Sequence, residues 1–199
     1  MSLLVLGTRN RKKVEELREL LQDVPISLAD LDAFPQAPEV PETGTTFEEN
    51  ARLKATTLAR ALRHWVLSED SGLVVPALGG EPGIRSAVYA GRHGDDAANN
   101  RLLLQKLADV PEEKRVAYYV CHAVLADPLG QVRASAEGRC YGRIALQERG
   151  QNGFGYDPLF LVPEYHRTFG ELSPLVKAAL SHRARAVEKL RPHLLTLLG

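Results

Sequence analysis

The clearest candidate for chemistry is a pair of adjacent carboxylates in the stretch Trp65-Val66-Leu67-Ser68-Glu69-Asp70-Ser71-Gly72-Leu73. Apolar residues lead into the acids, which predicts a strand that ends there in a tight turn, where ligands of open α/β sheets bind. Alternation along a strand points Glu69 and Asp70 to opposite faces, so at most one of them faces a given cleft. Two acids at a strand end suit a hard cation such as Mg²⁺. A polar turn with solvated acids is the alternative.

A second candidate is the polar turn near the N-terminus, which suits an anion. The apolar run 3–6 predicts a strand, and apolar spacing predicts a helix over 13–21. The turn between them carries Thr8, Asn10 and Lys13. Backbone N–H groups at a helix start bind phosphate readily, although the Walker A spacing is absent. Thr8 or Asn10 could equally serve as a helix cap.

Two later stretches could recognise a ligand. Glycines flank Phe154, which would leave an exposed ring free to stack on a nucleobase; alternatively, the aromatics of this stretch fill the core. Ser181 is a good helix cap and places His182 and Arg183 in a first helical turn. Cationic side chains conflict with the positive end of a helix dipole, which indicates a compensating anion or carbonyl-rich ligand, or else a solvated helix start.

The elements that must position these residues form a mixed pattern. Thr45 and Glu48 match a capping box, which predicts a helix over about 46–63 with Asn50 and Lys54 on one face. If that face lines a cleft, Lys54 becomes a partner for phosphate or for an acid. Residues 25–40 look like loop, and Asp95 or Asp96 can cap a helix that runs to about 108. Segments 115–126 and 131–141 predict an antiparallel hairpin, so we expect a mixed sheet flanked by helices.

Composition narrows the function classes. The 199 residues are 44% hydrophobic and 25% charged, enough for one sizeable domain or two lobes on a shared sheet. A formal net charge of zero argues against a broad basic face for nucleic acid. Cys121 and Cys140 lie in apolar runs, which predicts buried free thiols in a reducing compartment. Because no apolar run reaches the ~20 residues of a membrane span and no signal peptide is apparent, a cytoplasmic protein is expected.

Six motifs occur in a fixed order over nearly the whole chain. The motifs are Thr8-x-Asn10-x-x-Lys13, Glu42-Thr43-Gly44-x-Thr46-Phe47-x-x-Asn50-Ala51-x-x-Lys54-Ala55, Glu69-Asp70-Ser71-Gly72-Leu73, Gly79-Gly80-x-Pro82-Gly83, Gly153-Phe154-Gly155-Tyr156-Asp157-Pro158-Leu159-Phe160 and Ser181-His182-Arg183-Ala184. Together they resemble the inosine triphosphate pyrophosphatase (Ham1-like, RdgB-like) family of non-canonical purine nucleoside triphosphate pyrophosphatases.

This resemblance implies a fold and an activity. It implies one domain over 1–199, an elongated mixed α/β fold of two lobes with the active-site cleft between them. It also implies a homodimer that uses Mg²⁺ to hydrolyse ITP, dITP and XTP to the monophosphate and pyrophosphate. Mg²⁺ and lysines would neutralise the growing negative charge, and a carboxylate would activate water.

The resemblance also implies roles for single residues. Asp70 would bind the metal and act as general base, and Ser71 would touch the substrate. The base would stack on Phe154 beside Gly155, in a pocket shaped by Tyr156 and Asp157. The remaining substrate contacts would come from Thr8, Arg9, Asn10, Arg11, Lys12 and Lys13 on the triphosphate, and from Lys54, Lys177, His182 and Arg183.

Several positions depart from the usual family pattern. Arg9 and Lys12 make the phosphate turn more basic than is typical, and Arg85 and Val88 replace a usual tyrosine and arginine. Pro41 stands where many members have an acid, so we assign Glu42 as the second metal ligand, with Glu39 as the alternative. Two other functions stay open: a pyrophosphatase with another nucleotide preference, and a non-catalytic nucleotide sensor of the same fold.

Overall fold

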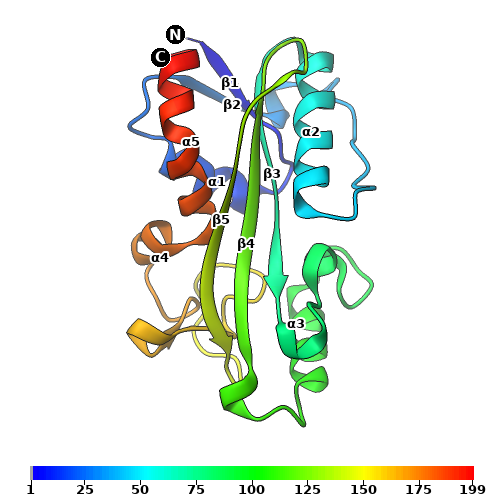
Figure 1. The fold of residues 1–199 in the computed structure, drawn as a ribbon, viewed down its shortest axis with the longest axis vertical. Coiled ribbons are helices and arrows are strands. Elements are labelled where there is room, and N and C mark those ends of the chain that lie inside the picture. The colour runs from blue at the N-terminus through cyan, green and yellow to red at the C-terminus, as the bar shows by residue number, and fades with distance from the viewer. Residues whose placement is uncertain (1) are drawn as a thin grey trace. The chain divides into compact units, whose positions relative to one another are not determined.

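A computed structural model describes residues 2–199, which form two compact units (Figure 1). The first unit contains residues 2–70, Cys121–Gly138 and His182–Gly199. The second contains Ser71–Val120 and Arg139–Ser181. Three long strands contribute residues to both units, so neither unit is a continuous piece of chain. That the two units act as one domain with a cleft between its lobes stays a prediction.

Seven strands of the described residues form one sheet in the order β2-β1-β3-β4-β5-β6-β7. β1 pairs in parallel with β2 and β3, whereas β6 pairs antiparallel with β5 and β7. The expected mixed α/β sheet is therefore confirmed. The strands are β1 (Leu3–Leu6), β2 (Ser27–Asp30), β3 (Trp65–Val74), β4 (Val116–Ala126), β5 (Val132–Ile144), β6 (Phe160–Val162) and β7 (Arg167–Thr168). The α-helices are α1 (Arg11–Leu20), α2 (Phe47–Leu62), α3 (Asp96–Lys106), α4 (Pro174–Leu180) and α5 (His182–Leu198).

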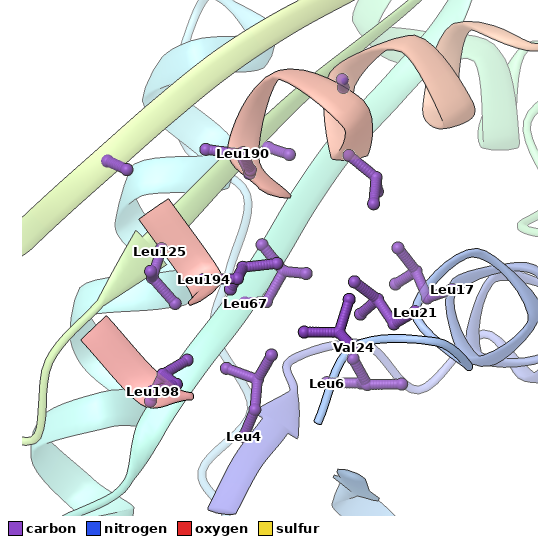
Figure 2. Packing of buried hydrophobic residues seen from close by; sticks show 14 of the residues in the cluster. Leu4, Leu6, Leu17, Leu21, Val24, Leu67, Leu125, Leu190, Leu194 and Leu198 are labelled. Atoms are coloured by element: carbon purple, nitrogen blue, oxygen red, sulfur yellow. The ribbon is translucent and has the colours of Figure 1, made fainter. Parts of the chain in front are cut away.

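The first unit buries apolar side chains on both faces of its sheet. On one face Leu4 and Leu6 pack in a cluster with residues of α1 and α5, among them Leu190 (Figure 2). On the other face Val5 and Val66 pack against α2. Figure 1 shows α2 on one side of β3 and α1 and α5 on the other. Since neighbouring strand residues point to opposite faces, this arrangement follows from strand alternation.

The second unit has its own core, which is rich in aromatic side chains. The rings of Phe160 and Phe169 stack with centroids 5.3 Å apart, and Tyr119 lies 4.6 Å from Phe160. Leu103 of α3 and Leu107 complete this cluster and are fully buried. The loops and short elements of this unit therefore pack on a common hydrophobic core.

Two predicted helix starts lie one or two residues from their observed positions, although Asn10 was a possible cap of the first. Asn10 caps α1, so Arg11 rather than Lys13 begins the helix. Thr46, not Thr45, caps α2, and its hydroxyl accepts from the N–H of Glu49. The Glu49 carboxylate accepts in turn from the backbone and side chain of Thr45. The capping-box chemistry is present one residue later than predicted.

The predicted end of the central strand was wrong. β3 continues through Ser71 and Gly72 to Val74, so Glu69 and Asp70 stand in mid-strand. Residues 25–40 also contain the short edge strand β2, where only loop was expected. Both errors have one cause: small and polar residues join a strand when a neighbouring strand supplies the backbone partners, which local sequence does not reveal.

Three other expectations are confirmed, namely the hairpin, the cap of the third helix and the two buried thiols. β4 and β5 are neighbours joined by a tight turn at 127–131, which is too short for a parallel connection. Asp95 caps α3. Cys121 and Cys140 are buried free thiols. Among residues 2–199, no helix combines the length and apolarity that crossing a membrane requires.

Candidate active site

The two adjacent acids of β3 lie just past the end of a parallel strand. Leu67 is the β3 partner of Leu6, the last residue of β1. The N–H of Gly7 donates to Leu67 O at 2.8 Å, and a Cβ on Gly7 would lie 2.0 Å from Ser68 Oγ. Glycine therefore lets the turn after β1 pass close to β3. The rule that ligands bind at the carboxyl ends of strands applies here to β1, not to β3.

Asp70 faces α2, which supplies a donor and a cation. Asn50 Nδ2 donates to Asp70 Oδ2 at 3.1 Å, and Lys54 Nζ lies 3.6 Å from Asp70 Oδ1. Asn50 Oδ1 accepts from the N–H of Gly44 at 2.8 Å, so the amide itself is fixed. Burial raises the pKa of Asp70; Lys54 opposes the shift, and nearby Glu42 adds to it. Asp70 is thus a held but incompletely neutralised carboxylate.

Lys54 lies between two carboxylates. Its Nζ is 2.5 Å from Glu42 Oε1 and 3.6 Å from Asp70 Oδ1. Burial acts to lower the pKa of Lys54, but Asp70 and Glu42 outweigh it and raise the pKa. Of the two acids considered in place of Pro41, Glu42 is the one that reaches Lys54.

The carboxylates of Glu42 and Asp70 fit a hard cation that keeps most of its water. Both present an oxygen to one cationic atom, Lys54 Nζ. Among residues 2–199, no group of three or more His, Cys, Asp or Glu residues could enclose a metal ion. Mg²⁺ is held in many phosphate-transfer sites by one or two carboxylates together with water and substrate phosphate, which matches this donor set.

Glu69 faces the opposite side of β3, where cations surround it. Its Oε1 lies 2.8 Å from Lys13 Nζ and 3.2 Å from Arg183 Nη2. The Cys121 thiol donates to Oε2 at 3.2 Å. Burial works to raise the pKa of Glu69, but Arg183 and Lys13 outweigh it and hold the pKa well below its usual value. The predicted opposite orientation of Glu69 and Asp70 is confirmed by these contacts.

Arg183 is anchored by carboxylates of the protein. It is 1% exposed and forms ion pairs with Glu16 of α1 and with Glu69. The conflict of a cation at the start of α5 indicated a compensating anion, and these two carboxylates supply it. Contact between Arg183 and the substrate stays a prediction.

The start of α1 concentrates positive charge. Asn10 Oδ1 accepts from the N–H groups of Lys12 and Lys13, and Thr8 Oγ1 accepts from the N–H of Asn10. The first turn of α1 contains no acid, whereas α2 begins with Glu48 and Glu49. Arg9 Nη2 donates to Ala37 O at 2.9 Å, which uses part of its guanidinium within the protein. Basic residues at a helix N-terminus oppose the dipole unless an anion binds there.

In the second unit, the loop that carries Phe154 is tightly held. Asp157 Oδ2 accepts from the N–H of Phe154 at 2.8 Å and from Lys177 Nζ at 2.6 Å. Lys177 Nζ also lies 4.5 Å from the centroid of the Phe154 ring. Gly153 has φ +75°, and a Cβ there would lie 2.0 Å from Asp157 Oδ2. Phe154 is half-buried, so it is neither fully exposed nor part of the core, and its stacking on a base stays a prediction.

Tyr156 and Asp157 are buried under this loop. The Tyr156 hydroxyl donates to Ser86 O at 2.8 Å, and Tyr119 OH donates to Asp157 Oδ1 at 3.3 Å. Burial raises the pKa of Tyr156 above its usual range, so it stays a neutral donor. These hydrogen bonds hold the buried part of the loop in place.

The predicted site residues fall into two groups by unit. The second unit holds Ser71, Phe154, Gly155, Tyr156, Asp157 and Lys177. The first unit holds Thr8, Arg9, Asn10, Arg11, Lys12, Lys13, Glu42, Lys54, Asp70, His182 and Arg183. Within the first unit the structure brings Lys54, Glu42 and Asp70 together. Lys13 and Arg183 pair instead with Glu69, although Lys13 lies near enough to Asp70 to act against the rise of its pKa.

Sequence reasoning did not identify the side chains that hold the candidate site residues. Arg183 is anchored by Glu16, which was not singled out, and by Glu69, which was considered as a cation ligand and not as a partner of Arg183 and Lys13. Glu16 follows Lys13 by three residues on one helix face, which is the only local signal that could have marked it. Asp96 and Asn100 of α3 contact Gly155, and their spacing of four is a comparable signal.

Comparison with known proteins places this geometry in a family. The model of the Ham1 family matches residues 4–193. A dITP/XTP pyrophosphatase of Rhodopirellula baltica is 55% identical over 98% of this chain and 94% of its own. A dITP/XTP pyrophosphatase of Exiguobacterium sibiricum is 47% identical over 98% of this chain and 98% of its own. The solved structure of a HAM1 protein from Coxiella burnetii matches with TM-score 0.89 and 38% identity, covering 98% of this chain and all of that one.

Proposed function

The chain belongs to the Ham1 family, and we propose that it hydrolyses deaminated purine nucleoside triphosphates (ITP, dITP and XTP) to the monophosphate and pyrophosphate. Relatives named dITP/XTP pyrophosphatase support this substrate class, since they match over nearly the full chain. The observation that carries the proposal is the cluster of Asp70, Asn50, Lys54 and Glu42 past the end of β1.

In this proposal Asp70 is the general base. A base must be within hydrogen-bonding reach of water and must accept a proton. Asn50 fixes one oxygen of Asp70, while Lys54 stands farther off at 3.6 Å from the other. Burial raises the pKa of Asp70, which makes it a better proton acceptor than a solvated aspartate. Water attacks the α-phosphorus, the α–β anhydride bond breaks, and pyrophosphate leaves with the bonding electron pair.

The start of α1 would hold the triphosphate. Arg11, Lys12 and Lys13 occupy its first turn without any acid. Thr8 and Asn10 arrange the turn, and the Asn10 cap through Oδ1 directs its Nδ2 donors away from the helix. A polyanion relieves the conflict between these cations and the helix dipole.

Mg²⁺ would be held by Asp70 and Glu42. When bound, it supplies positive charge to the triphosphate and to the pyrophosphate leaving group. The chain's own contribution is to orient the two carboxylates, through Asn50 for Asp70 and through Lys54 for both.

The loop of Phe154 would recognise the base, which stacks on the ring while Asp157 and Lys177 fix its surroundings. Ser71, His182 and Arg183 would add substrate contacts. Hypoxanthine and xanthine carry a carbonyl at position 6, which accepts hydrogen bonds where the amino group of adenine cannot. A site that leaves buried polar groups unpaired with the wrong base can discriminate by up to ~10⁴-fold.

A homodimer is the proposed assembly. The strand residues Tyr141 and Val116 are 58% and 43% exposed, large fractions for apolar side chains. The rings of Tyr118 and Tyr141 lie 5.5 Å apart, and the Arg139 guanidinium lies 5.1 Å from the Tyr118 centroid. Aromatic and arginine side chains are enriched at interfaces. Light scattering should give the mass of two chains, and Tyr141→Glu should give that of one; a wild-type monomer would refute the dimer.

The test of the activity is pyrophosphate release. We expect rapid release from ITP, dITP and XTP with Mg²⁺, slow release from ATP, whose base has an amino group at position 6, and none with a chelator. Asp70→Asn should lower kcat about 10³-fold yet still bind ITP, while the same change at the exposed acid Asp109 serves as the matched control. Tight ITP binding without turnover by the wild type at any Mg²⁺ concentration would overturn the enzyme proposal in favour of the sensor.

A further inference from the structure

Three consecutive peptide groups around Phe154 are each held by a side chain. The N–H of Phe154 donates to Asp157 Oδ2 at 2.8 Å. The N–H of Gly155 donates to Asp96 Oδ2 at 2.8 Å. Asn100 Nδ2 donates to Gly155 O at 3.2 Å. The peptide planes on both sides of the Phe154 Cα are therefore fixed, and they set the direction of its side chain.

Two of these three side chains come from one helix. Asp96 and Asn100 are four residues apart on α3, so they lie on the same face. Asp95 caps the helix by accepting from the N–H of Ala98 at 3.0 Å, which leaves Asp96 for the loop. Helix and loop lie far apart in sequence but belong to the same unit.

The loop needs such a clamp because of its composition. Gly153 and Gly155 flank Phe154 with φ of +75° and +61°. Glycine populates many backbone conformations at little cost, so by themselves these residues would leave the ring undirected.

The amide oxygen of Asn100 gives further evidence that this side chain holds the loop. The residue is 3% exposed, and its Oδ1 has no hydrogen-bond partner within residues 2–199. A buried acceptor without a partner costs stability, and in native structures such groups call for a functional explanation. Nδ2 must face Gly155 O, because a carbonyl accepts and does not donate.

We propose that Asp96 and Asn100 are positioning residues for base recognition: they hold the Gly155 peptide so that the Phe154 ring is presented to the purine. The proposal rests on the proposed function, because it assigns these residues to the base part of the same site. Neither residue touches the reacting phosphate; they act through the loop, on affinity for the base.

The test compares four variants with the wild type. Asp96→Ala removes the acceptor, and Asp96→Asn retains an oxygen at that position. Asn100→Leu cannot donate to Gly155 O and also removes the unpartnered Oδ1. Asp95→Ala is the matched control, since it weakens the α3 cap without removing a contact of Gly155. Steady-state kinetics with ITP, inhibition by inorganic tripolyphosphate, melting temperature and amide exchange at Gly155 are measured for each.

For Asp96→Ala and Asn100→Leu we expect KM for ITP to rise about tenfold with kcat nearly unchanged, as loss of base stacking would give. Inhibition by tripolyphosphate, which has no base, should not change. Asp96→Ala should speed exchange of the Gly155 amide, and Asp96→Asn should restore KM. Asp95→Ala should lower the melting temperature while leaving KM at the wild-type value.

Two results would overturn the positioning role. One is an unchanged KM in Asp96→Ala despite faster exchange at Gly155. The other is a fall in kcat and melting temperature in Asp96→Ala and Asn100→Leu that Asp95→Ala reproduces, because this would mean general destabilisation. Failure of the proposed function gives a different result, namely a wild-type protein that releases no pyrophosphate from ITP.

Discussion

Two adjacent carboxylates on opposite faces of β3 lie in different charge environments. On the α1 and α5 face, Glu69 meets Lys13 and Arg183, and its pKa lies well below the usual value although burial opposes this. On the α2 face, Asp70 meets Asn50 and the more distant Lys54, and burial raises its pKa. Neighbours in sequence thus differ in charge environment because a strand sends them to different helices.

This difference in charge environment gives the two carboxylates different roles, one in stabilising the fold and one in the proposed reaction. A carboxylate whose charge is fully matched holds cations in place but is a poor base. One that is buried and incompletely matched is a better proton acceptor and a better ligand for an added cation. Pairs of acids whose environments push their pKa values apart commonly divide roles in this way.

The largest expected effect is the loss of kcat on substitution of Asp70. Asp70→Asn keeps the size of the side chain and an acceptor for Asn50 but removes the base, so kcat should fall about 10³-fold. Because a buried carboxylate with a raised pKa is costly at neutral pH, the same variant should not be less stable than the wild type. Pyrophosphate release and thermal unfolding check both points; substantial turnover in Asp70→Asn would break the proposed division of roles.

Glu69→Gln should act mainly on stability. It leaves Arg183 buried with one fewer carboxylate and Lys13 without this ion pair, and breaking a buried pair costs about 3 kcal/mol. Urea unfolding at neutral pH measures the loss, with Glu15→Gln on the exposed side of α1 as control. If the two variants were equally stable, Glu69 would not be the structural member of the pair.

The pH dependence of stability should sharpen the comparison. The folded-state pKa of Glu69 lies below its ordinary value of 4.5, so its stabilisation is fully present above that value. It should be lost as pH falls from about 4.5 towards the folded-state pKa. In metal-free protein, the gap in unfolding free energy between wild type and Glu69→Gln should therefore close on acidification. A gap that widens at low pH would contradict the assigned direction.

The smallest expected effect concerns the thiol beside Glu69. Cys121→Ala removes a weak donor and a small volume from a packed interior, which should cost about 1 kcal/mol and leave KM for ITP unchanged. Chemical denaturation and steady-state kinetics test this. A large loss of activity would give Cys121 a role that the ion pairs of Glu69 do not predict.

The sequence predicted what depends on local order. Alternation placed Glu69 and Asp70 on opposite faces, and helical spacing placed Asn50 and Lys54 together on the face that meets Asp70. These predictions succeeded because periods of strand and helix are intrinsic to the backbone. The end of β3 was misplaced, because its continuation through Ser71 and Gly72 depends on sheet pairing.

Long-range ion pairing could not be predicted. Arg183 meets Glu16 across 167 positions and Glu69 across 114, and neither spacing has a local signature. The clamp on Gly155 is similar, because it joins α3 to a loop 59 residues away from Asp96. Family resemblance assigned roles to residues of known motifs, but it did not identify the side chains that hold them.

The segmented make-up of the first unit has a consequence for synthesis on the ribosome. In its hydrophobic core Leu4 and Leu6 of β1 pack with Leu190, Leu194 and Leu198 of α5. β1 is synthesised first, so it cannot form these contacts until α5 has been synthesised. At translation rates of about 5–20 residues per second, that delay is on the order of ten seconds or more. Throughout it, the strand lacks the part of its apolar cover that α5 supplies, so apolar surface stays exposed on the nascent chain.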